Sequence, residues 1–454
     1  DAATGLSVIA AAHPGSAFVT ADAEGGTVTR STPLGRVSAG RTSAGSVFDV
    51  LAERLAVAVE PGDPADAGGR DAGVAGPLGW FGWFGYELGG GLNDVPTSNA
   101  DTPDAAFLFI DRAIVFDHAT RTVRLAWIED DGADAVGAGA AWAEELAAEL
   151  DELPAASARL SPISAPSPAA DQGEMPAVRW RHHPDRYADL IAACQAAIVR
   201  GDAYQLCLTN QVDIDVRPDP ASTYLLLRAS SPSHHGGYVR FGDVALLSAS
   251  PELFLHVDAD RIVSTKPMKG TRPRGADARR DDELRRELLA SDKERAENLM
   301  IVDLMRNDLG RIAELGSVSV TSLLEVEEYA HVHQLVSTVQ ARLRHPLTAL
   351  DVVRAAFPAG SMTGAPKRSA MSILHALEAG PRGVYSGAFG YLGVDGSADL
   401  AMVIRSIVLT PSGASIGTGG GITALSVAAE EIEETRVKAR ALLAVLLGAS
   451  ARVE

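Results

Sequence analysis

Residues 252–266 read ELFLHVDADRIVSTK, in which two runs of aliphatic, aromatic and β-branched residues flank a short polar turn at 258–260. This pattern predicts strands at 252–258 and 261–266 that pair as a hairpin. A similar short turn, VDGSAD at 394–399, separates two further strand-like runs. Antiparallel strands can be joined by such turns, whereas parallel strands need a long crossover. Successive hairpins therefore predict an antiparallel α+β fold rather than alternating strand–helix–strand units.

The remaining segments contain both helical and strand-like patterns. Helices are predicted at 140–152, 185–200, 281–311, 347–357, 366–379 and 427–447. Further strands are predicted at 113–117, 122–128, 204–216, 237–248, 317–321, 386–394, 398–410 and 414–417. A stretch rich in proline, serine and alanine, without periodicity, covers 153–175. We therefore expect an N-terminal part at 1–152, a linker at 153–175 and a C-terminal part at 176–454.

Bulk properties argue against several classes of protein. The chain has 454 residues and a net charge of −19, which disfavours binding to nucleic acid because neutralising phosphates requires a basic surface. No apolar run is long enough to span a membrane, no secretory leader opens the chain, and Cys194 and Cys207 are too few for a disulfide scaffold. We expect a cytoplasmic protein that binds neither membrane nor nucleic acid. Because the sequence begins at Asp1 rather than methionine, we also expect that N-terminal residues are missing.

A dense basic turn follows the first hairpin. Residues 264–275 read STKPMKGTRPRG and contain Lys266, Lys269, Arg272 and Arg274, although the chain is acidic overall. The charge of this turn predicts an anion-binding loop. The alternative is that some of these cations hold the loop itself.

The predicted helix at 293–312 carries carboxylates on its apolar face. At 3.6 residues per turn, Glu294, Glu297 and Asp308 fall on the same stripe as the aliphatic residues Ile301 and Leu304. Burying ionised carboxylates is costly unless they are paired or bind a metal. The simpler alternative is a solvated first turn, where glutamate is favoured near a helix N-terminus.

The last predicted helix repeats this arrangement. Glu431, Glu434 and Lys438 share a stripe with the aliphatic residues of 427–447. Glu434 and Lys438 also have the spacing of an exposed ion pair, which would be worth a few tenths of a kcal/mol. Two helices with acids on their apolar stripes favour a Mg²⁺ site, because Mg²⁺ takes a few carboxylate ligands and completes its shell with water and substrate.

A glycine-rich segment precedes the last helix. Gly419, Gly420 and Gly421 are consecutive in GTGGGIT (417–423), and their N–H groups predict an anion-binding nest close to a helix start. A plain tight turn is the alternative. His331 and His333 are two residues apart, but without a third ligand nearby we favour a structural role over a metal site.

Taken together, these stretches resemble the chorismate-utilising enzyme family. The matching motifs are SASPELFL (248–255), PMKGTRPRG (267–275), ERAENLMIVDLMRNDLGRI (294–312), HQLVSTV (333–339), GSMTGAPK (360–367), YSGAFGY (385–391), IRSIVL (404–409), GTGGGIT (417–423) and EEIEETRVKA (430–439). GWFGWFGYELG (79–89) resembles the N-terminal half of such synthases. The resemblance implies two packed antiparallel β-sheets flanked by helices, as in anthranilate synthase component I, with the N-terminal half in the same body and 176–454 as the chorismate-binding catalytic part.

The resemblance also implies site residues, with chorismate as substrate and Mg²⁺ as cofactor. Glu297 and Glu434 match the magnesium carboxylates, and Glu294 and Glu431 match residues that support them. Glu252 matches the acid that assists departure of the ring hydroxyl. Further matches to substrate-binding positions are Gly270, Thr271, Thr363, Tyr385, Arg405, Gly419, Gly420, Gly421 and Lys438.

Branches of this family differ in their nucleophile. Water-using isochorismate and salicylate synthases carry a lysine base where this chain has Gln205, which argues against water activation. Anthranilate synthases resemble Pro-Ile-Ala-Gly-Thr-Arg, whereas aminodeoxychorismate synthases resemble Pro-Ile-Lys-Gly-Thr-Arg, which this chain matches with Lys269 but not with Met268. The resemblance therefore implies that ammonia aminates chorismate at C4 through a covalent Lys269 adduct, giving 4-amino-4-deoxychorismate for 4-aminobenzoate and folate synthesis. The alternatives are an anthranilate synthase component I and a water-using isochorismate or salicylate synthase.

Two details refine this expectation. A lysine must be neutral to act as a nucleophile, so we expect burial and the neighbouring Arg272 and Arg274 to lower the pKa of Lys269. Family members usually have histidine directly before Leu-Val-Ser, where this chain has Gln334 with His333 one place earlier. Because that histidine is tied to pyruvate elimination, its absence favours a product that keeps its enolpyruvyl group.

The source of ammonia is a separate question. A glutaminase needs a nucleophilic cysteine on a glycine-flanked turn. Cys194 lies in an apolar helical run and Cys207 in a strand-like run, without such glycines. We therefore expect a glutamine amidotransferase subunit that forms a heterodimer with this chain and supplies ammonia.

Overall fold

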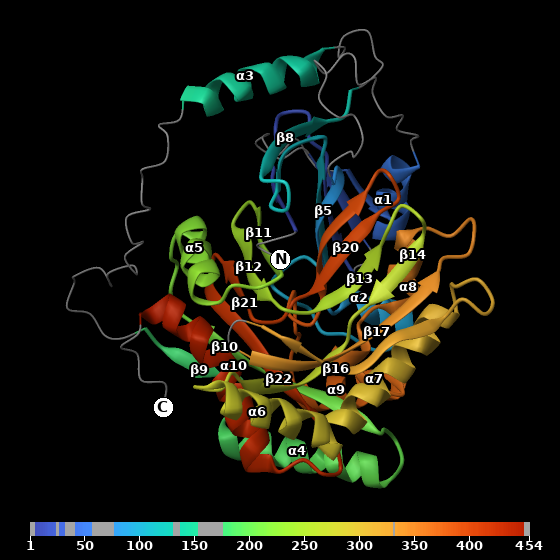
Figure 1. The fold of residues 1–454 in the computed structure, drawn as a ribbon, viewed down its shortest axis with the longest axis vertical. Helices are drawn as coiled ribbons and strands as arrows, with labels where there is room; N and C mark the ends of the chain where they lie inside the picture. Colours follow the sequence, from blue (N-terminus) through green and yellow to red (C-terminus); the bar gives the residue numbers. More distant parts are fainter. Residues whose placement is uncertain are drawn as a thin grey trace.

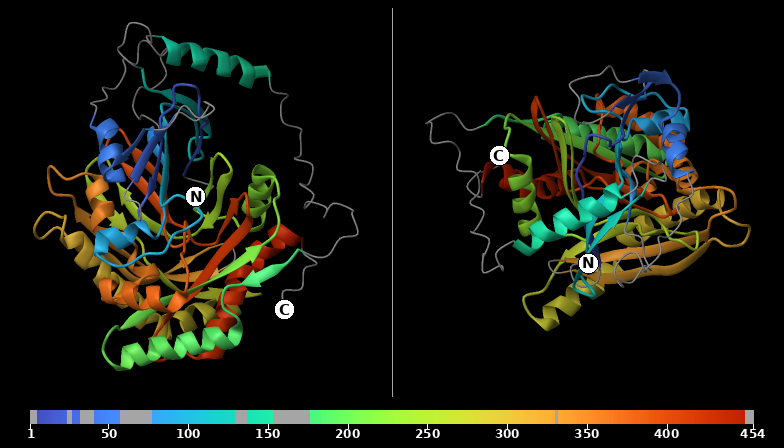
Figure 2. Two further views of the ribbon diagram at one scale, coloured as in Figure 1. Left: turned by 180° about the vertical axis from the view of Figure 1, so that it is seen from behind. Right: turned by 90° about the horizontal axis from the view of Figure 1, so that it is seen from above.

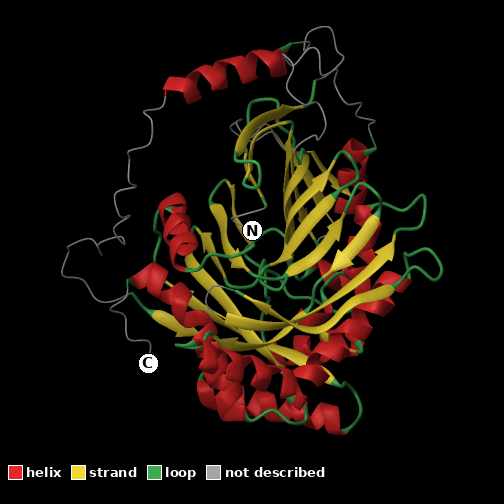
Figure 3. Ribbon diagram, in the orientation of Figure 1, coloured by secondary structure: helices red, strands yellow, loops and turns green. Residues whose placement is uncertain are grey.

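The computed structural model describes residues 5–23, 27–31, 41–56, 77–129, 137–152, 176–329 and 332–448. In these residues two large β-sheets face each other and most helices lie on their outer sides (Figure 1, Figure 3). The predicted linker at 153–175 and His331 lie outside the described residues. No helix in the described ranges is both long enough and apolar enough to cross a membrane.

The larger sheet has twelve strands and joins both halves of the chain. Its order is β15 (Met268–Pro273), β17 (Val332–Arg342), β14 (Ile262–Thr265), β13 (Leu253–Val257), β20 (Ala398–Met402), β19 (Ala388–Gly393), β5 (Gly79–Phe84), β6 (Ala105–Ile110), β2 (Phe18–Asp22), β3 (Thr27–Ser31) and β4 (Arg41–Ala44), with β16 (Ser319–Glu328) also on β17. The two halves meet where β5 pairs with β19, from Phe84 opposite Ala388 to Gly79 opposite Gly393. The GWFGWF segment therefore forms a strand inside the common body, as the resemblance implies.

The second large sheet has seven strands, and a small third sheet has three. The seven are β11 (His235–Phe241), β12 (Val244–Ser250), β21 (Ser406–Thr410), β22 (Gly413–Ile422), β10 (Gln205–Ile214), β18 (Gly364–Ala365) and β9 (Val178–Trp180), and the three are β1 (Leu6–Ile9), β7 (Arg112–Asp117) and β8 (Thr122–Trp127). The strand pairs are antiparallel throughout the described residues, which confirms the α+β class.

Helical elements complete the fold, and most of them pack on the outside of the sheets, which two further directions also show (Figure 2). They are α1 (Val47–Leu55), α2 (Leu88–Asn93), α3 (Ala138–Glu152), α4 (Pro184–Val199), α5 (Pro220–Ser230), α6 (Ala278–Ala290), α7 (Asp292–Gly310), α8 (Ala349–Ala356), the 3₁₀ turn η1 (Gly360–Met362), α9 (Lys367–Glu378) and α10 (Ala428–Leu447). Helix α7 packs on β17 and β15, and α10 packs on β22, so each large sheet receives one of the acid-bearing helices.

Three elements that were predicted to be continuous are interrupted. The helix predicted at 281–311 breaks at Ser291, which has extended backbone and accepts a hydrogen bond from the N–H of Glu294, so it caps a new helix. The strand predicted at 237–248 turns back at Gly242, whose φ of +59° suits a tight hairpin. The strand predicted at 398–410 breaks before Ser406, and Arg405, with a φ of +51°, lies where the chain passes from one large sheet to the other.

Asp308 is the part of the acidic stripe on α7 that has a structural role. Its carboxylate accepts a hydrogen bond from the Lys367 ammonium at 2.7 Å, and that ammonium also donates to the Ala356 carbonyl at 2.6 Å. Both charges are buried, and the pair holds α7 against the start of α9.

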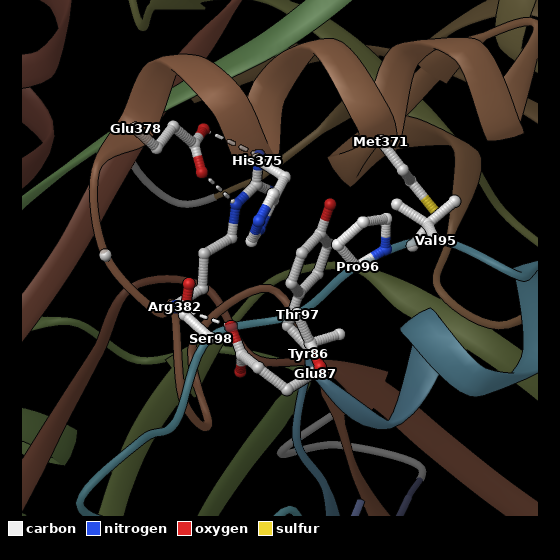
Figure 4. Close-up of a pocket in the computed structure, with 11 residues that line it drawn as sticks. Tyr86, Glu87, Val95, Pro96, Thr97, Ser98, Met371, His375, Glu378 and Arg382 are labelled. Atoms are coloured by element: carbon white, nitrogen blue, oxygen red, sulfur yellow. Dashed lines mark hydrogen bonds and ion pairs between the residues drawn. The ribbon is translucent and has the colours of Figure 1, made fainter. Parts of the chain in front are cut away.

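A second buried ion pair ties the N-terminal half to the C-terminal half. The Arg382 guanidinium donates to both carboxylate oxygens of Glu378, at 2.7 and 2.8 Å. The backbone N–H groups of Arg382 and Gly383 donate to the carboxylate of Glu87, and the ring of Tyr86 lies against the guanidinium, 4.1 Å from its centroid. Figure 4 shows these groups around a small recess beside α9. Since its charges are already paired, we do not place the chemistry of the protein there.

Loss of one partner of this ion pair should destabilise the protein strongly. We predict that Arg382→Met lowers the free energy of unfolding by about 3–5 kcal/mol, because Glu378 would remain buried without its counter-ion. Urea denaturation measures this change. The exposed pair of Glu433 and Arg440 provides the control: Arg440→Met should cost less than about 1 kcal/mol. Equal costs for the two variants would contradict the structural role of Arg382.

Candidate active site

Lys269 lies at the centre of a group of carboxylates. It belongs to the edge strand β15, where a β-bulge at Gly270 interrupts the pairing with β17 between Lys269 and Thr271. Gly270 has a φ of +80°, a left-handed conformation that glycine adopts without strain. The space beside Gly270 is also filled, because a Cβ there would lie 2.9 Å from a carboxylate oxygen of Glu294 and 2.8 Å from Leu288. The bulge therefore turns the side chain of Lys269 toward the interior. It also lets the backbone of Gly270 lie close to α7.

The charge environment of Lys269 differs from our expectation. Burial alone would lower its pKa, but the facing carboxylates of Glu297, Glu252 and Glu434 outweigh burial and raise the pKa instead. The expected lowering of this pKa is therefore wrong for the protein without ligands. Lys269 therefore stays an ammonium ion under the influence of acids that come from three different parts of the fold.

The other cations of the basic turn hold the loop. Lys266 pairs with Glu327 at 3.0 Å, and Arg272 pairs with Glu287 at 2.9 Å. Arg274 forms a two-pronged pair with Asp281, at 2.7 and 2.9 Å. These contacts support the alternative in which the remaining cations are structural, and Lys269 is the cation that faces the site.

Asp281 collects several donors at the end of β15. Besides Arg274, it accepts hydrogen bonds from the N–H of Gly275 at 2.6 Å and from Nε2 of His333 at 2.9 Å. The Arg274 hydrogen bond contributes most to lowering the pKa of Asp281, so this carboxylate stays ionised. His333 is fully buried in this network, which agrees with a structural role for it.

Helix α7 supplies Glu297 and Glu294. Glu297 is 6% exposed, and burial raises its pKa to about 7 although the Lys269 charge opposes this. Glu294 lies farther toward the surface, with its carboxylate 3.7 Å from the Arg272 guanidinium. Of the two, Glu297 is the carboxylate whose charge is less fully compensated.

Helix α10 supplies Glu431 and Glu434, each paired with a lysine. Glu431 is buried and accepts a hydrogen bond from Lys293 of α7 at 3.0 Å. The Glu434 side chain is 49% exposed and pairs with Lys438 at 2.6 Å, and this ammonium lowers the pKa of Glu434 against the loss of some of its water. The predicted pair at this spacing is therefore present, and it lies at the site rather than apart from it.

The glycine segment allows these carboxylates to approach each other. A Cβ on Gly420 would lie 3.0 Å from a carboxylate oxygen of Glu431 and 3.9 Å from one of Glu434. A Cβ on Gly421 would lie 3.3 Å from a carboxylate oxygen of Glu297 and would clash with Gln205. Acids from α7 and α10 thus meet over a strand that has no side chains at these two positions.

The predicted anion nest at Gly419–Gly421 is wrong. These glycines belong to β22, where Gly419 pairs with Thr209 and Gly421 pairs with Cys207 of β10. N–H groups along a strand point alternately to its two edges, so consecutive ones cannot converge on a single anion. Lys438 donates instead to the carbonyl of Gly419 at 2.7 Å, and α10 begins only at Ala428.

Glu252 lies on the other side of Lys269, directly before β13. It is 7% exposed, and burial raises its pKa to about 6 although Lys269 opposes this. Ser361 donates a hydrogen bond that favours its charged form, and both residues line a small cavity together with Thr265. A buried carboxyl with a pKa close to neutrality suits a general acid.

Arg405 provides a positive charge in the same region. In the described part of the chain, no acid lies within 4.0 Å of its guanidinium. Burial lowers its pKa, while Tyr385 and Glu434 act in the opposite sense, so both are close enough to interact with it. The ring of Tyr385 packs directly against the backbone of Gly417. An unpaired guanidinium beside a tyrosine is suited to bind a carboxylate.

Two of the predicted substrate-binding residues are engaged elsewhere. The hydroxyl of Thr363 donates to the carbonyl of Ala359 at 3.1 Å, within its own turn. The hydroxyl of Thr271 accepts from the side chain of Gln334 at 3.4 Å. A role of these two hydroxyls in binding substrate stays a prediction.

The carboxylates suit Mg²⁺ by their chemistry, although their present spacing is loose. Among the residues that the structure describes, no group of three or more His, Cys, Asp or Glu side chains is close enough to hold a metal ion. Three carboxylates nevertheless provide oxygen donors in the same region, those of Glu297, Glu434 and Glu431. The charges of Glu431 and Glu434 are each neutralised by a lysine. Mg²⁺ commonly takes one or two carboxylates and completes its shell with water and substrate. The donor set fits this cation.

The sequence did not indicate that the side chain of Gln205 would lack a hydrogen-bond partner. It also did not indicate that Lys293 would belong to the site. Gln205 is 1% exposed, and its side-chain carbonyl oxygen has no hydrogen-bond partner within the described residues. It lies against Gly421, beside Glu297. Its position where water-using relatives have lysine was the signal that pointed to it.

Removing the charge of Glu297 should stabilise the protein at alkaline pH. The pKa of Glu297 is raised to about 7, so between about pH 4.5 and 7 the folded state keeps a proton that the unfolded state has lost, and stability falls as pH rises. We predict that Glu297→Gln raises the free energy of unfolding by about 1–3 kcal/mol at pH 8 and by much less at pH 4.5. Urea denaturation without divalent cations measures this.

Two comparisons make this test specific. Glu325→Gln, on the exposed side of β16, should change stability little at either pH. Excess Mg²⁺ should stabilise the unmodified protein at pH 8 but not Glu297→Gln, because a ligand that binds the folded state stabilises it. Destabilisation by Glu297→Gln at pH 8 without metal would contradict the described charge environment.

The chain resembles proteins with several related activities. A family model described as chorismate binding enzyme matches residues 22–444. The aminodeoxychorismate synthases of Streptomyces griseus and Streptomyces pristinaespiralis are 47% and 44% identical to it, over 80% and 77% of this chain. These matches cover 49% and 48% of the two proteins, so the chain spans about half their length. Anthranilate synthase component 1 of Streptomyces coelicolor is 39% identical over 81% of this chain and 72% of its own length.

Solved structures agree with the fold. Anthranilate synthase component I of Streptococcus pneumoniae superposes with a TM-score of 0.77 and 29% identity, covering 96% of this chain and 92% of its own. The menaquinone-specific isochorismate synthase of Escherichia coli has a TM-score of 0.63 at 18% identity, covering 98% and 95%, and shares the fold. The sheets, the facing acids and the match over most of the sequence lead to one conclusion: the chain belongs to the chorismate-binding enzyme family.

Proposed function

We propose that this chain aminates chorismate at C4 with ammonia to give 4-amino-4-deoxychorismate. The observation that carries the proposal is the position of Lys269, an ammonium influenced by the charges of Glu297, Glu252 and Glu434, in the motif that distinguishes aminodeoxychorismate synthases from anthranilate synthases. The 47% identity to an aminodeoxychorismate synthase supports the same reaction. Proposed roles follow from the surroundings of each residue.

In this proposal the site binds a dicarboxylate through separate charges. Within the described residues Arg405 has no acidic partner within 4.0 Å, and we propose that it binds one substrate carboxylate, while Lys438 and Tyr385 border the same region. When bound at Glu297 and Glu434, with Glu294 and Glu431 in support, Mg²⁺ would hold the ring carboxylate and neutralise the acids that raise the pKa of Lys269. Lys269 then loses its proton more readily and can act as a nucleophile.

The proposed first step forms one bond and breaks another. The neutral Nζ of Lys269 attacks C2 of the ring, the double bonds C1=C2 and C5=C6 shift to C1=C6 and C4=C5, and the C4 hydroxyl leaves. Glu252 gives its proton to this hydroxyl, which departs as water. A pKa of about 6 lets Glu252 hold that proton in part of the molecules near neutral pH and release it on demand.

The proposed second step reverses the first with a different nucleophile. Ammonia attacks C4, the double bonds return to C1=C2 and C5=C6, and the Lys269 amine leaves from C2 and takes up the proton that the new C4 amine loses, which restores the enzyme. The unpartnered carbonyl oxygen of Gln205 is a hydrogen-bond acceptor at the edge of the site, and an amide there cannot act as the base that water would need. Gln334 next to Thr271 likewise provides no base for pyruvate elimination.

The wider setting belongs to the same proposal. The product would serve 4-aminobenzoate and folate synthesis in the cytoplasm, and ammonia would come from a glutamine amidotransferase partner.

We also propose that residues 1–152 complete the body of the synthase and that 176–454 carry the catalytic residues, because β5 and the Glu87 contacts join the two parts. The alternative is anthranilate formation, which the 39% identity to an anthranilate synthase component supports.

One assay separates these functions. We predict that the protein converts chorismate, Mg²⁺ and an ammonium salt to a product with the mass of 4-amino-4-deoxychorismate, without release of pyruvate. Chromatography with mass detection and a coupled pyruvate assay measure both outcomes. Anthranilate with stoichiometric pyruvate would support the alternative and contradict the proposal, and isochorismate would contradict both aminating functions.

A further inference from the structure

Four large apolar side chains are exposed on neighbouring elements of the fold. Val199 is 82% exposed, Tyr204 68%, Leu425 71% and Val427 51%. They come from the end of α4, the residue before β10 and the loop before α10. We call these four residues the apolar rim.

Backbone contacts hold the parts of the apolar rim together. The side chain of Gln195 on α4 donates to the carbonyl of Ser426 at 2.8 Å and to that of Thr423 at 3.4 Å, which fixes the loop that carries Leu425 against α4. Leu206 pairs with Ile422 at the start of β10, so Tyr204 lies beside the same loop. Helices α4 and α10 lie side by side in this region (Figure 1). The four rim residues therefore lie on neighbouring elements of the fold.

The apolar rim borders the candidate active site. Tyr204 directly precedes Gln205, whose unpartnered oxygen lies beside Gly421 and Glu297. Val427 lies one helical turn before Glu431. A protein that covers the rim would therefore also cover the edge of the site at which Gln205 lies.

The proposed reaction indicates what covers this surface. It consumes ammonia, which at neutral pH is mostly protonated and is lost to solvent unless it is delivered directly. Cys194 and Cys207 are both buried, and burial raises the pKa of each thiol, so within the described residues no cysteine can serve as a glutaminase nucleophile. The aminodeoxychorismate synthase of Streptomyces griseus has about as much chain again as the part that matches here, so in that protein a further body accompanies the matching half.

From the position of the rim, its exposed apolar side chains and the need for ammonia, we infer that the apolar rim is the docking face for a glutamine-hydrolysing protein that delivers ammonia at Gln205. This inference rests on the proposed amination. Tyrosine is a typical anchor of such a surface, leucine adds apolar contact area, and loss of an anchor commonly weakens binding tenfold or more. The charged pair of Arg200 and Asp202 forms a polar edge beside Val199.

The test compares two sources of ammonia. We expect Tyr204→Asp and Leu425→Asp to lower glutamine-dependent turnover at least tenfold when the purified glutamine amidotransferase subunit of the same organism is added. Ammonium-dependent turnover of the same variants should stay within about twofold of the unmodified protein. The variants Tyr204→Ser and Leu425→Ser introduce no charge and are less disruptive to folding. In them, glutamine-dependent turnover should again fall more than ammonium-dependent turnover, but by a smaller factor. The matched control is Leu315→Asp, a fully exposed leucine beyond the far end of α7, which should change neither activity.

Several outcomes would overturn the inference. Unchanged glutamine-dependent turnover in the rim variants would do so, as would equal loss of both activities in the serine variants. If the unmodified protein lacks ammonium-dependent turnover, the proposed function fails, and calorimetric binding of the same subunit then decides the inference by itself. Dissociation of a homodimer by the rim variants, without a change in subunit binding, would assign the surface to a second copy of this chain.

Discussion

The partly buried charge of Lys269 constrains the arrangement of the elements around it. An ammonium that is largely withdrawn from water needs negative charge nearby, and here Glu297, Glu252 and Glu434 supply it from α7, from the start of β13 and from α10. Each acid is also costly alone, which is why burial raises the pKa of Glu252 and Glu297. The carboxylates and the lysine therefore stabilise one another, and a ligand that changes one charge changes the protonation of the others.

This compensation requires both sheets to be in place. Helix α7 packs on the larger sheet and α10 on the seven-stranded sheet, and their acids meet over Gly420 and Gly421 of β22, where side chains would occupy the space. Arg405 lies where the chain crosses between the sheets. The buried pair of Arg382 and Glu378 fixes the joint between the N-terminal half and this region. The site is thus a property of the packing of the sheets rather than of one loop.

The sequence predicted the parts that local pattern controls. Hairpin turns gave the antiparallel class, and acids on the apolar stripes of two helices pointed to Glu297, Glu431 and Glu434. The break at Ser291 was missed because a serine cap inside a polar run resembles a continuous helix. The raised pKa of Lys269 was missed because the acids that cause it are distant in sequence. The glycines were taken for a nest because their pairing with β10 is a tertiary contact.

The central claim is that Lys269 changes from a compensated ammonium to the nucleophile that attacks the ring. The most direct measurement is to mix the protein with chorismate and Mg²⁺ in the absence of ammonia, quench with acid, and locate any adduct by peptide mass spectrometry. The account predicts that Lys269 gains the mass of chorismate less one water, that added ammonia discharges this adduct, and that Lys269→Ala forms none. Product formation at the full rate by Lys269→Ala, with no modified Lys269 in the unmodified protein, would contradict it.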